Sequence, residues 1–159
     1  MKQLMSITLL IGLIAFGTSC NKSDDEVTPS PSSNYFIFGS YFGFCVGNCV
    51  NLYKLDGEEL LEDDMDSMAS LIDPVFGTSS LSQDKVDLAR QLLDVLPTSL
   101  QKEGGIHGCP NCVDQGAFFI KLINEEGETV EWHLDTYRET LPEEVRDFVE
   151  EMTAVMGQL

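Results

Sequence analysis

The sequence predicts an α+β domain, in which an antiparallel sheet from two hairpins has two helices packed on one face. Two short turn motifs flanked by strand-forming residues predict the hairpins, and two stretches with apolar side chains at helical spacing predict the helices. The elements follow one another as strand, hairpin, helix, hairpin and helix, an order typical of α+β folds. A chain of 159 residues suits one such domain, which we place at residues 35–159 behind a leader.

Residues 1–19 are typical of a secretory signal peptide. Lys2 precedes the apolar run 7–16, which is shorter than the about 20 residues of a membrane-spanning helix but suits a signal-peptide core. Small residues then lead into Cys20, and this pattern resembles the lipobox of bacterial lipoproteins. The resemblance implies that the leader is cut before Cys20 and that acyl chains on this cysteine anchor the protein in a lipid bilayer. The alternatives are a secreted protein cut near Ser19 and a buried N-terminal helix.

An acidic segment follows the lipidation site. It consists of Ser23, Asp24, Asp25 and Glu26. The segment resembles the export signal that Bacteroidota place behind the lipidated cysteine of surface lipoproteins, which implies an outer-membrane protein that faces outward. Otherwise the acidic run is only a solvated tether and the protein faces the periplasm. Residues 20–34 are rich in Ser, Pro and Asp and predict a flexible tether that reaches about 20 Å.

The charge balance narrows the class of partner. The chain has 27 acidic and 9 basic residues, so its formal net charge is −18. Nucleic acids and anionic lipid head groups both require clustered Lys and Arg, so no nucleic-acid partner is expected. A hydrophobic fraction of 43% is ordinary for a folded chain and excludes wholesale disorder.

The first predicted elements are a strand and a hairpin. Residues 35–44 combine aromatic residues with glycines, which predicts a strand with a bulge or bend. We expect its rings to pack in the core rather than to form a sugar-binding platform. Residues 51–55 and 58–61 flank Asp56-Gly57, a two-residue turn signal for a hairpin. The predicted register places Lys54 opposite Glu59 and Tyr53 opposite Leu60.

The second hairpin surrounds Glu125-Glu126-Gly127, a three-residue loop with Gly at the left-handed position. Its predicted strands are residues 117–124 and 128–135. Every cross-strand pair in this register joins compatible side chains. The pairs are Leu122–Val130, Ile120–Trp132, Phe118–Leu134, Lys121–Glu131 and Phe119–His133.

Helical periodicity predicts the remaining two elements. The first helix begins near Ser82 and is ended by Pro97. Its predicted core positions are Val86, Ala89, Leu92, Leu93 and Leu96. The second helix starts with a capping box in residues Thr140-Leu141-Pro142-Glu143. Its predicted core positions are Val145, Phe148, Val149, Met152, Val155, Met156 and Leu159.

The order of motifs in the domain resembles that of uncharacterised bacterial exported domains. The resemblance rests on a strand with closely spaced cysteines, a Gly-turn hairpin, and a strand pair that leads into a Pro-capped helix. It covers residues 42–56 and 114–152. The resemblance supports the α+β fold and implies no activity.

Four cysteines remain behind the lipidation site: Cys45, Cys49, Cys109 and Cys112. Export favours structural disulfides, because exported thiols meet oxidising machinery. The first alternative is a zinc-like metal site on the same four cysteines, with His107 as an extra ligand. The second is a redox-active Cys109-Pro110-Asn111-Cys112, although no helix is predicted beside Cys112 to stabilise a thiolate.

The disulfide connectivity stays open at this point. Four cysteines allow three pairings, and loop-closure entropy favours the long-range ones, which would tie the two hairpins together. Local pairs remain the alternative, and they are more easily reduced.

Other chemistry is weakly indicated. Residues 62–66 resemble half a calcium loop, but they lack the Gly and the distal Glu, so we interpret them as a solvated acidic loop. No nucleophile elbow or phosphate-binding loop is present in the sequence. The sequence therefore predicts a non-enzymatic surface lipoprotein that binds a protein or small-molecule partner without a cofactor. The alternative is a metal-binding or thiol-redox module of the envelope.

Overall fold

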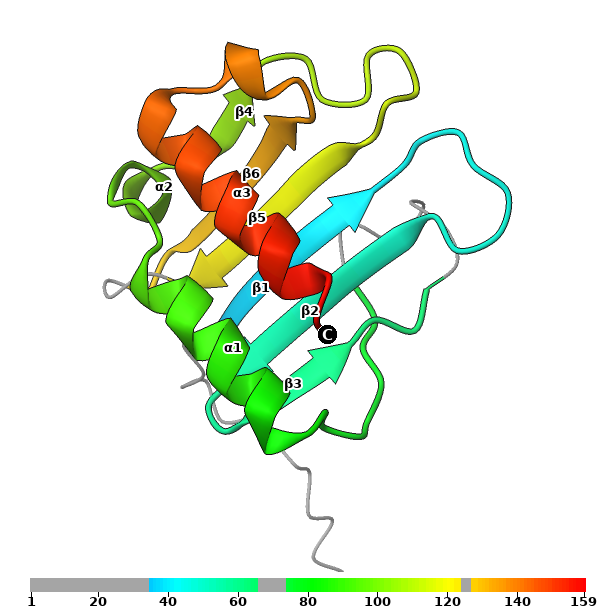
Figure 1. Cartoon of the computed structure of the whole chain (residues 1–159), viewed down its shortest axis with the longest axis vertical. Coiled ribbons are helices and arrows are strands. Elements are labelled where there is room, and N and C mark those ends of the chain that lie inside the picture. Colours follow the sequence, from blue (N-terminus) through cyan, green and yellow to red (C-terminus); the bar gives the residue numbers. More distant parts are fainter. Residues whose placement is uncertain (1–34, 66–73, 124–126) are drawn as a thin grey trace, which may run out of the picture. The chain divides into compact units, whose positions relative to one another are not determined.

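The structure is a computed structural model that describes residues 35–65, 74–123 and 127–159 (Figure 1). All of these residues belong to the compact unit formed by residues 31–159. The leader, the lipidation site Cys20 and the acidic segment 23–26 lie outside the described residues, so the expectations for them stay predictions.

The described strands form one six-stranded sheet in the order β3-β2-β1-β5-β6-β4. They are β1 (Tyr35–Tyr41), β2 (Val50–Asp56), β3 (Glu59–Glu62), β4 (Gly105–His107), β5 (Ala117–Ile123) and β6 (Thr129–Asp135). All neighbours are antiparallel except β4, which pairs in parallel with β6. The α+β class is confirmed, but two hairpins alone do not describe the sheet. β1 lies at the centre of the sheet and joins the two hairpins. β4 is an edge strand of 3 residues, too short for alternating apolar and polar side chains to be recognised in the sequence.

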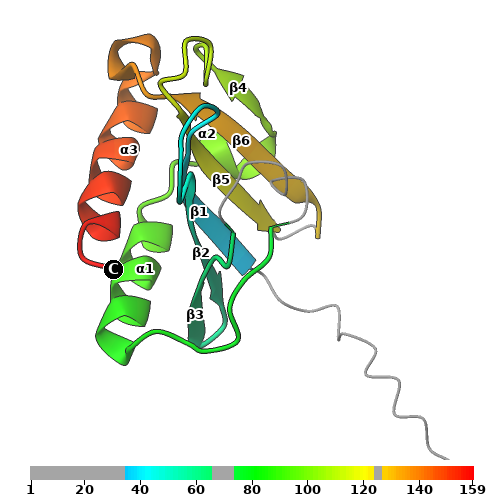
Figure 2. The ribbon, with the colours of Figure 1, turned by 90° about the vertical axis from the view of Figure 1, so that its right-hand side faces the viewer.

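The helices lie on one face of this sheet, as predicted (Figure 2). The described helices are α1 (Gln83–Asp94), α2 (Ser99–Lys102) and α3 (Glu143–Met156), and a 3-10 turn, η2 (Arg138–Thr140), precedes α3. α1 and α3 are neighbours that cross the sheet. The single-turn α2 was not predicted, because four residues carry no measurable period. The carbonyl of Leu100 in α2 accepts the indole N–H of Trp132 at 3.2 Å.

The main core lies between the helices and the sheet. Its most deeply buried side chains include Phe36, Phe38, Leu92, Ile120 and Met152. The predicted core positions of both helices all pack here, with Leu93, Met156 and Leu159 only partly buried. A smaller cluster occupies the opposite face of the sheet, because successive strand side chains point to opposite faces. It contains Ile37, Tyr41, Val50, Leu52, Met65, Ala117 and Phe119.

The aromatic segment 35–44 divides between core and surface. Phe36 and Phe38 are 1% and 0% exposed and pack in the core as expected, whereas Phe42 and Phe44 are 44% and 83% exposed, so the expectation is wrong for these two rings. The strand ends at Tyr41, however, and not at residue 44. Within it Gly39 has φ +152°, and a Cβ added there would overlap the carbonyl oxygen of Asn51 in β2. The glycine is therefore required by the close approach of the two strands.

The second hairpin has the predicted register, and the first does not. All five predicted pairs of the second hairpin are formed. In the first, Asp56 lies opposite Glu59 and Leu55 opposite Leu60, so the turn is Gly57-Glu58 and the predicted pairs are wrong. The observed register places Leu55 and Leu60 together in the core. Lys54 pairs with Asp56 of its own strand at 2.8 Å instead of with Glu59.

The predicted capping box of α3 is also not formed. The helix begins at Glu143 behind Pro142, without a hydrogen bond from a capping side chain. The hydroxyl of Thr140 donates instead to the carbonyl of Tyr137 at 2.7 Å and lies 3.3 Å from Oδ2 of Asp135. Thr140 belongs to η2, and because its hydroxyl donates to the carbonyl of Tyr137 at the start of that turn, it does not cap α3.

Candidate functional site

Two loops lie at the same end of the sheet, where β1 ends and β5 begins. Tyr41 of β1 pairs with Ala117 of β5, which places loop 42–49 beside loop 108–116 (Figure 1). The backbone N–H of Gly43 donates to Oδ1 of Asn111 at 3.0 Å, so the loops are in direct contact. We call these two loops together the loop end of the domain.

Each loop is closed by its own disulfide. Cys45 is bonded to Cys49 and Cys109 to Cys112, with Cα–Cα distances of 5.7 and 5.5 Å. The expectation of disulfides is confirmed, and of the three pairings the two local bridges are present. The long-range bridges that loop-closure entropy favours are not formed. Loop contact is provided instead by hydrogen bonding, through Asn111.

The surroundings of Cys109 and Cys112 agree with a loop motif. A turn follows Cys112 and leads into β5, so no helix begins directly after either cysteine. Both cysteines are exposed. Among the described residues no three His, Cys, Asp or Glu side chains are placed to hold a metal ion together. The metal and redox interpretations stay predictions.

A buried carboxylate holds the second loop in place. Asp135, at the end of β6, is 2% exposed. Its Oδ2 accepts the N–H of Cys109 at 2.7 Å, and its Oδ1 accepts the N–H of Tyr137 at 2.9 Å. Burial alone raises the pKa of Asp135, but these two bonds, with those from Gln115 and Thr140, outweigh it and lower the pKa. Asp135 therefore stays ionised and acts as an anchor for the loop.

The sequence did not identify Asp135, which was only the last residue of a predicted strand. The available signal was an Asp two residues before Tyr137, the spacing of an Asx turn. The contact with Cys109 spans 26 residues and carries no local signal. Gly108 packs against this carboxylate with φ +74°, and a Cβ there would lie 2.5 Å from Cβ of Asp135.

The second loop has further internal order. The side chain of Gln115 donates to the carbonyl of Cys109 at 2.8 Å and accepts the N–H of Val113 at 2.7 Å. Asn111 and Asp114 have positive φ angles of 57° and 61°, which these residue types tolerate better than most. The loop is thus held by side-chain bonds as well as by its disulfide.

Large apolar side chains project from both loops. Phe44 is 83%, Val46 105% and Val113 68% exposed, and Phe42 is partly exposed. Loop 42–49 contains no charged residue and loop 108–116 only Asp114, although the chain has a net charge of −18. The loop end therefore presents apolar, nearly uncharged surface on an otherwise acidic protein.

His107 and His133 both have ring partners. The ring of His107, in β4, stacks on Trp132 with centroids 4.7 Å apart. Its proposed role as a metal ligand is not tested by this contact. Nδ1 of His133 forms a hydrogen bond with the hydroxyl of Tyr41 at 2.9 Å, and its Nε2 lies 3.2 Å from Oε1 of Glu131. The sequence missed this contact because it did not place β1 beside β5.

The contacts of His133 continue to Lys121 through Glu131. Glu131 also pairs with Lys121 at 3.0 Å, as the hairpin register predicts. Burial, and secondarily the charge of Glu131, raise the pKa of Tyr41, which favours the protonated phenol.

The acidic segment at residues 62–66 is used within the fold. Oδ2 of Asp63 accepts the N–H of Leu52 at 2.6 Å, and its Oδ1 accepts the N–H of Met65 at 3.1 Å. Asp66 lies outside the described residues. These bonds give Asp63 a role in positioning the chain after β3.

Comparison with known proteins yields no relative. No protein-family model, curated protein or solved structure matches the chain. Among the described residues, no helix has the length and apolarity to cross a bilayer.

Proposed function

We propose that the chain is an outer-membrane lipoprotein, displayed on the cell surface, whose domain is a non-enzymatic module that binds a partner protein through its loop end. One observation carries the proposal: Phe44, Val46 and Val113 are exposed on loops that contain almost no charge. The cores of protein interfaces are depleted in charged residues and enriched in aromatic ones. Exposed apolar surface of this kind marks interaction sites on soluble domains.

The order of the loops supports binding. Each disulfide, the Gly43–Asn111 bond and the bonds to Asp135 reduce the conformations open to the loops before a partner arrives. Less conformational entropy is then lost on association, so a small apolar surface gains affinity. In the proposed setting, acyl chains on Cys20 hold the protein in the outer membrane.

Site-specific photocross-linking in intact cells tests the proposal. A photoreactive phenylalanine analogue replaces Phe44 or Val113, and in the matched control it replaces Glu59, which is exposed at the opposite end of the sheet. We expect positions 44 and 113 to give an adduct with the same protein, and position 59 to give none. Phe44→Ser combined with Val46→Ser should abolish the adduct from position 113.

Two results would overturn the proposal. Adducts of equal yield from position 59 would show unspecific contact. Adducts with lipid alone would show that the apolar side chains insert into a membrane and do not bind a protein.

A second candidate function is thiol handling, favoured by the exposure of the local Cys109–Cys112 disulfide. Exposed bridges are the ones that exchange with other thiols. Protein purified from its native envelope separates the candidates by thiol titration. Four cysteines that react only after strong reductant support the binding module. Thiols that appear on chelation indicate metal, and a bridge reduced by a mild dithiol indicates redox exchange.

A further inference from the structure

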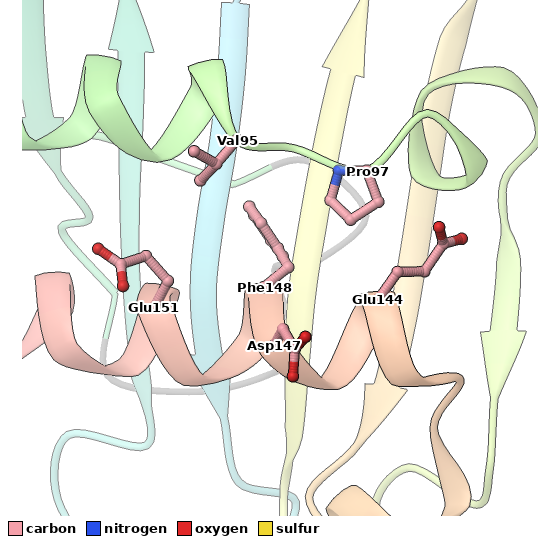
Figure 3. Close-up of a pocket in the computed structure, with 6 residues that line it drawn as sticks. All are labelled: Val95, Pro97, Glu144, Asp147, Phe148 and Glu151. Atoms are coloured by element: carbon pink, nitrogen blue, oxygen red, sulfur yellow. The ribbon is translucent and has the colours of Figure 1, made fainter.

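A groove of about 440 Å³ lies between the C-terminal end of α1 and α3 (Figure 3). Its lining consists of Val95, Pro97, Glu144, Asp147, Phe148 and Glu151. We call it the helix groove. None of these residues belongs to the loop end, so the helix groove is a surface separate from the one in the proposed function.

The floor of the helix groove is apolar. Phe148 points from α3 toward α1 and lies between Val95 and Pro97 (Figure 3). Val95 is 56% exposed, whereas Phe148 is 3% exposed and belongs to the core. The apolar surface of the core thus continues outward through Val95 to the solvent, where an apolar side chain of a ligand would cover it.

The walls of the groove are negative. Glu144, Asp147 and Glu151 are exposed on one side of α3, three and four residues apart, a spacing at which like charges on a helix repel one another. No basic side chain of the described part forms an ion pair with any of the three. Glu144 is held by the hydroxyl of Ser99, which donates to its Oε1 at 2.6 Å.

The end of α1 adds to this negative potential. The last turn of α1 contains no basic residue, and the helix is capped at Val95, inside the groove. Carbonyl groups at a helix C-terminus carry partial negative charge that favours a nearby cation. A cationic ligand in the groove would therefore reduce the repulsion between the carboxylates of α3. It would also interact favourably with the partial negative charge of the carbonyl groups at the end of α1.

We propose that the helix groove docks a basic peptide segment of a partner protein. An aliphatic side chain of the segment covers the exposed side chain of Val95, and two Arg or Lys side chains pair with Glu144 and Glu151. Glu144 and Glu151 are seven residues apart, which is about 10 Å along a helix. An extended polyproline II segment brings every third residue to the same side at intervals of about 9 Å, so an Arg-x-x-Arg spacing fits the two carboxylates.

Fluorescence anisotropy with the full-length protein in neutral detergent tests the docking. The probe is a labelled peptide, Gly-Arg-Leu-Pro-Arg-Leu-Pro-Arg-Gly, and its control replaces each Arg with Gln. We expect the Arg peptide to bind and the Gln peptide not to bind. Glu144→Gln with Glu151→Gln should weaken binding about tenfold, because two exposed charge pairs of about threefold each are lost.

Matched variants keep the test specific. Glu59→Gln with Glu150→Gln changes the net charge equally at exposed positions outside the groove and should leave affinity unchanged. Val95→Ser should weaken binding without unfolding the protein, since the side chain is exposed. Equal losses in both double variants would overturn the proposal in favour of unspecific attraction. Equal competition by spermidine at the peptide's concentration would overturn it in favour of a small-cation site.

Discussion

At Asp135, a carboxylate that is 2% exposed accepts the backbone N–H groups of Cys109 and Tyr137. These two bonds fasten the second disulfide loop to the end of β6. An amide has one acceptor oxygen where the carboxylate has two, so an Asn at this position leaves one of the two N–H donors without its acceptor.

The hydrogen bonds of Asp135 predict a loss of stability when its carboxylate is replaced. Asp135→Asn should lower the free energy of unfolding by about 1.5–3 kcal/mol, the range for hydrogen bonds to a charged group. Urea denaturation measures the change. Asp114→Asn also removes one negative charge, from an exposed position in the loop that Asp135 holds. It should change the free energy of unfolding by less than about 0.5 kcal/mol. Equal stability of both variants would contradict the anchoring role.

The lowered pKa of Asp135 makes this contribution dependent on pH. Because the folded state holds the pKa below its ordinary value, the contribution is complete above about pH 4 and is lost as the pH falls through the lower pKa of the folded state. The difference in unfolding free energy between the native protein and Asp135→Asn should therefore shrink in acid. A difference that stays constant down to pH 2 would show that ionisation is unimportant.

Gly39 gives a further prediction at the residue scale. An added methyl group would overlap the carbonyl of Asn51, so Gly39→Ala should destabilise the domain by about 1–3 kcal/mol, as overpacking does. Gly157→Ala is the control, because its nearest contact would be 3.6 Å away. Thermal unfolding of the two variants compares them, and similar midpoints would contradict the close approach of β1 and β2.

At the scale of elements, the register of a hairpin can be predicted when several side-chain pairs favour the same alignment. The second hairpin was predicted with its register because five side-chain pairs and a Gly loop favour the same alignment. The first hairpin has a shorter second strand, and its turn signal Asp56-Gly57 is compatible with two alignments. Burial of Leu55 against Leu60 decided between them, and burial is a property of the whole fold.

The disulfide loops give a prediction at this scale. Cys109→Ser should release Cys112 as the only new thiol, because the two bridges are local. The free energy of unfolding should fall by about 2 kcal/mol or less, the value for a loop of four residues. Labelling with a thiol probe and peptide mass mapping identifies the free cysteine. Label on Cys45 or Cys49 would show that the bridges connect the two loops.

At the scale of the whole molecule, the proposed lipid anchor at Cys20 lies outside the described residues and is tested separately from the fold. If Cys20 carries the lipid, Cys20→Ala should abolish partition into detergent, because the variant loses the site at which the anchoring acyl chains are attached. Alanine at Ser23, Asp24, Asp25 and Glu26 should keep the anchor and reduce access of external protease. Phase separation and protease treatment of intact cells measure the two effects. Unchanged fractionation of Cys20→Ala would refute lipidation.

The sequence by itself determined the α+β class, the positions of the main helices and the second hairpin, because periodicity and turn residues are local properties. Only the tertiary structure decided that β1 joins the hairpins, that β4 pairs in parallel, and that the four cysteines form local bridges. It also decided the partners of Asp135 and placed the two loops together. These features depend on contacts between residues far apart in the chain, whose free energies are set by the burial and hydrogen bonding of the complete fold.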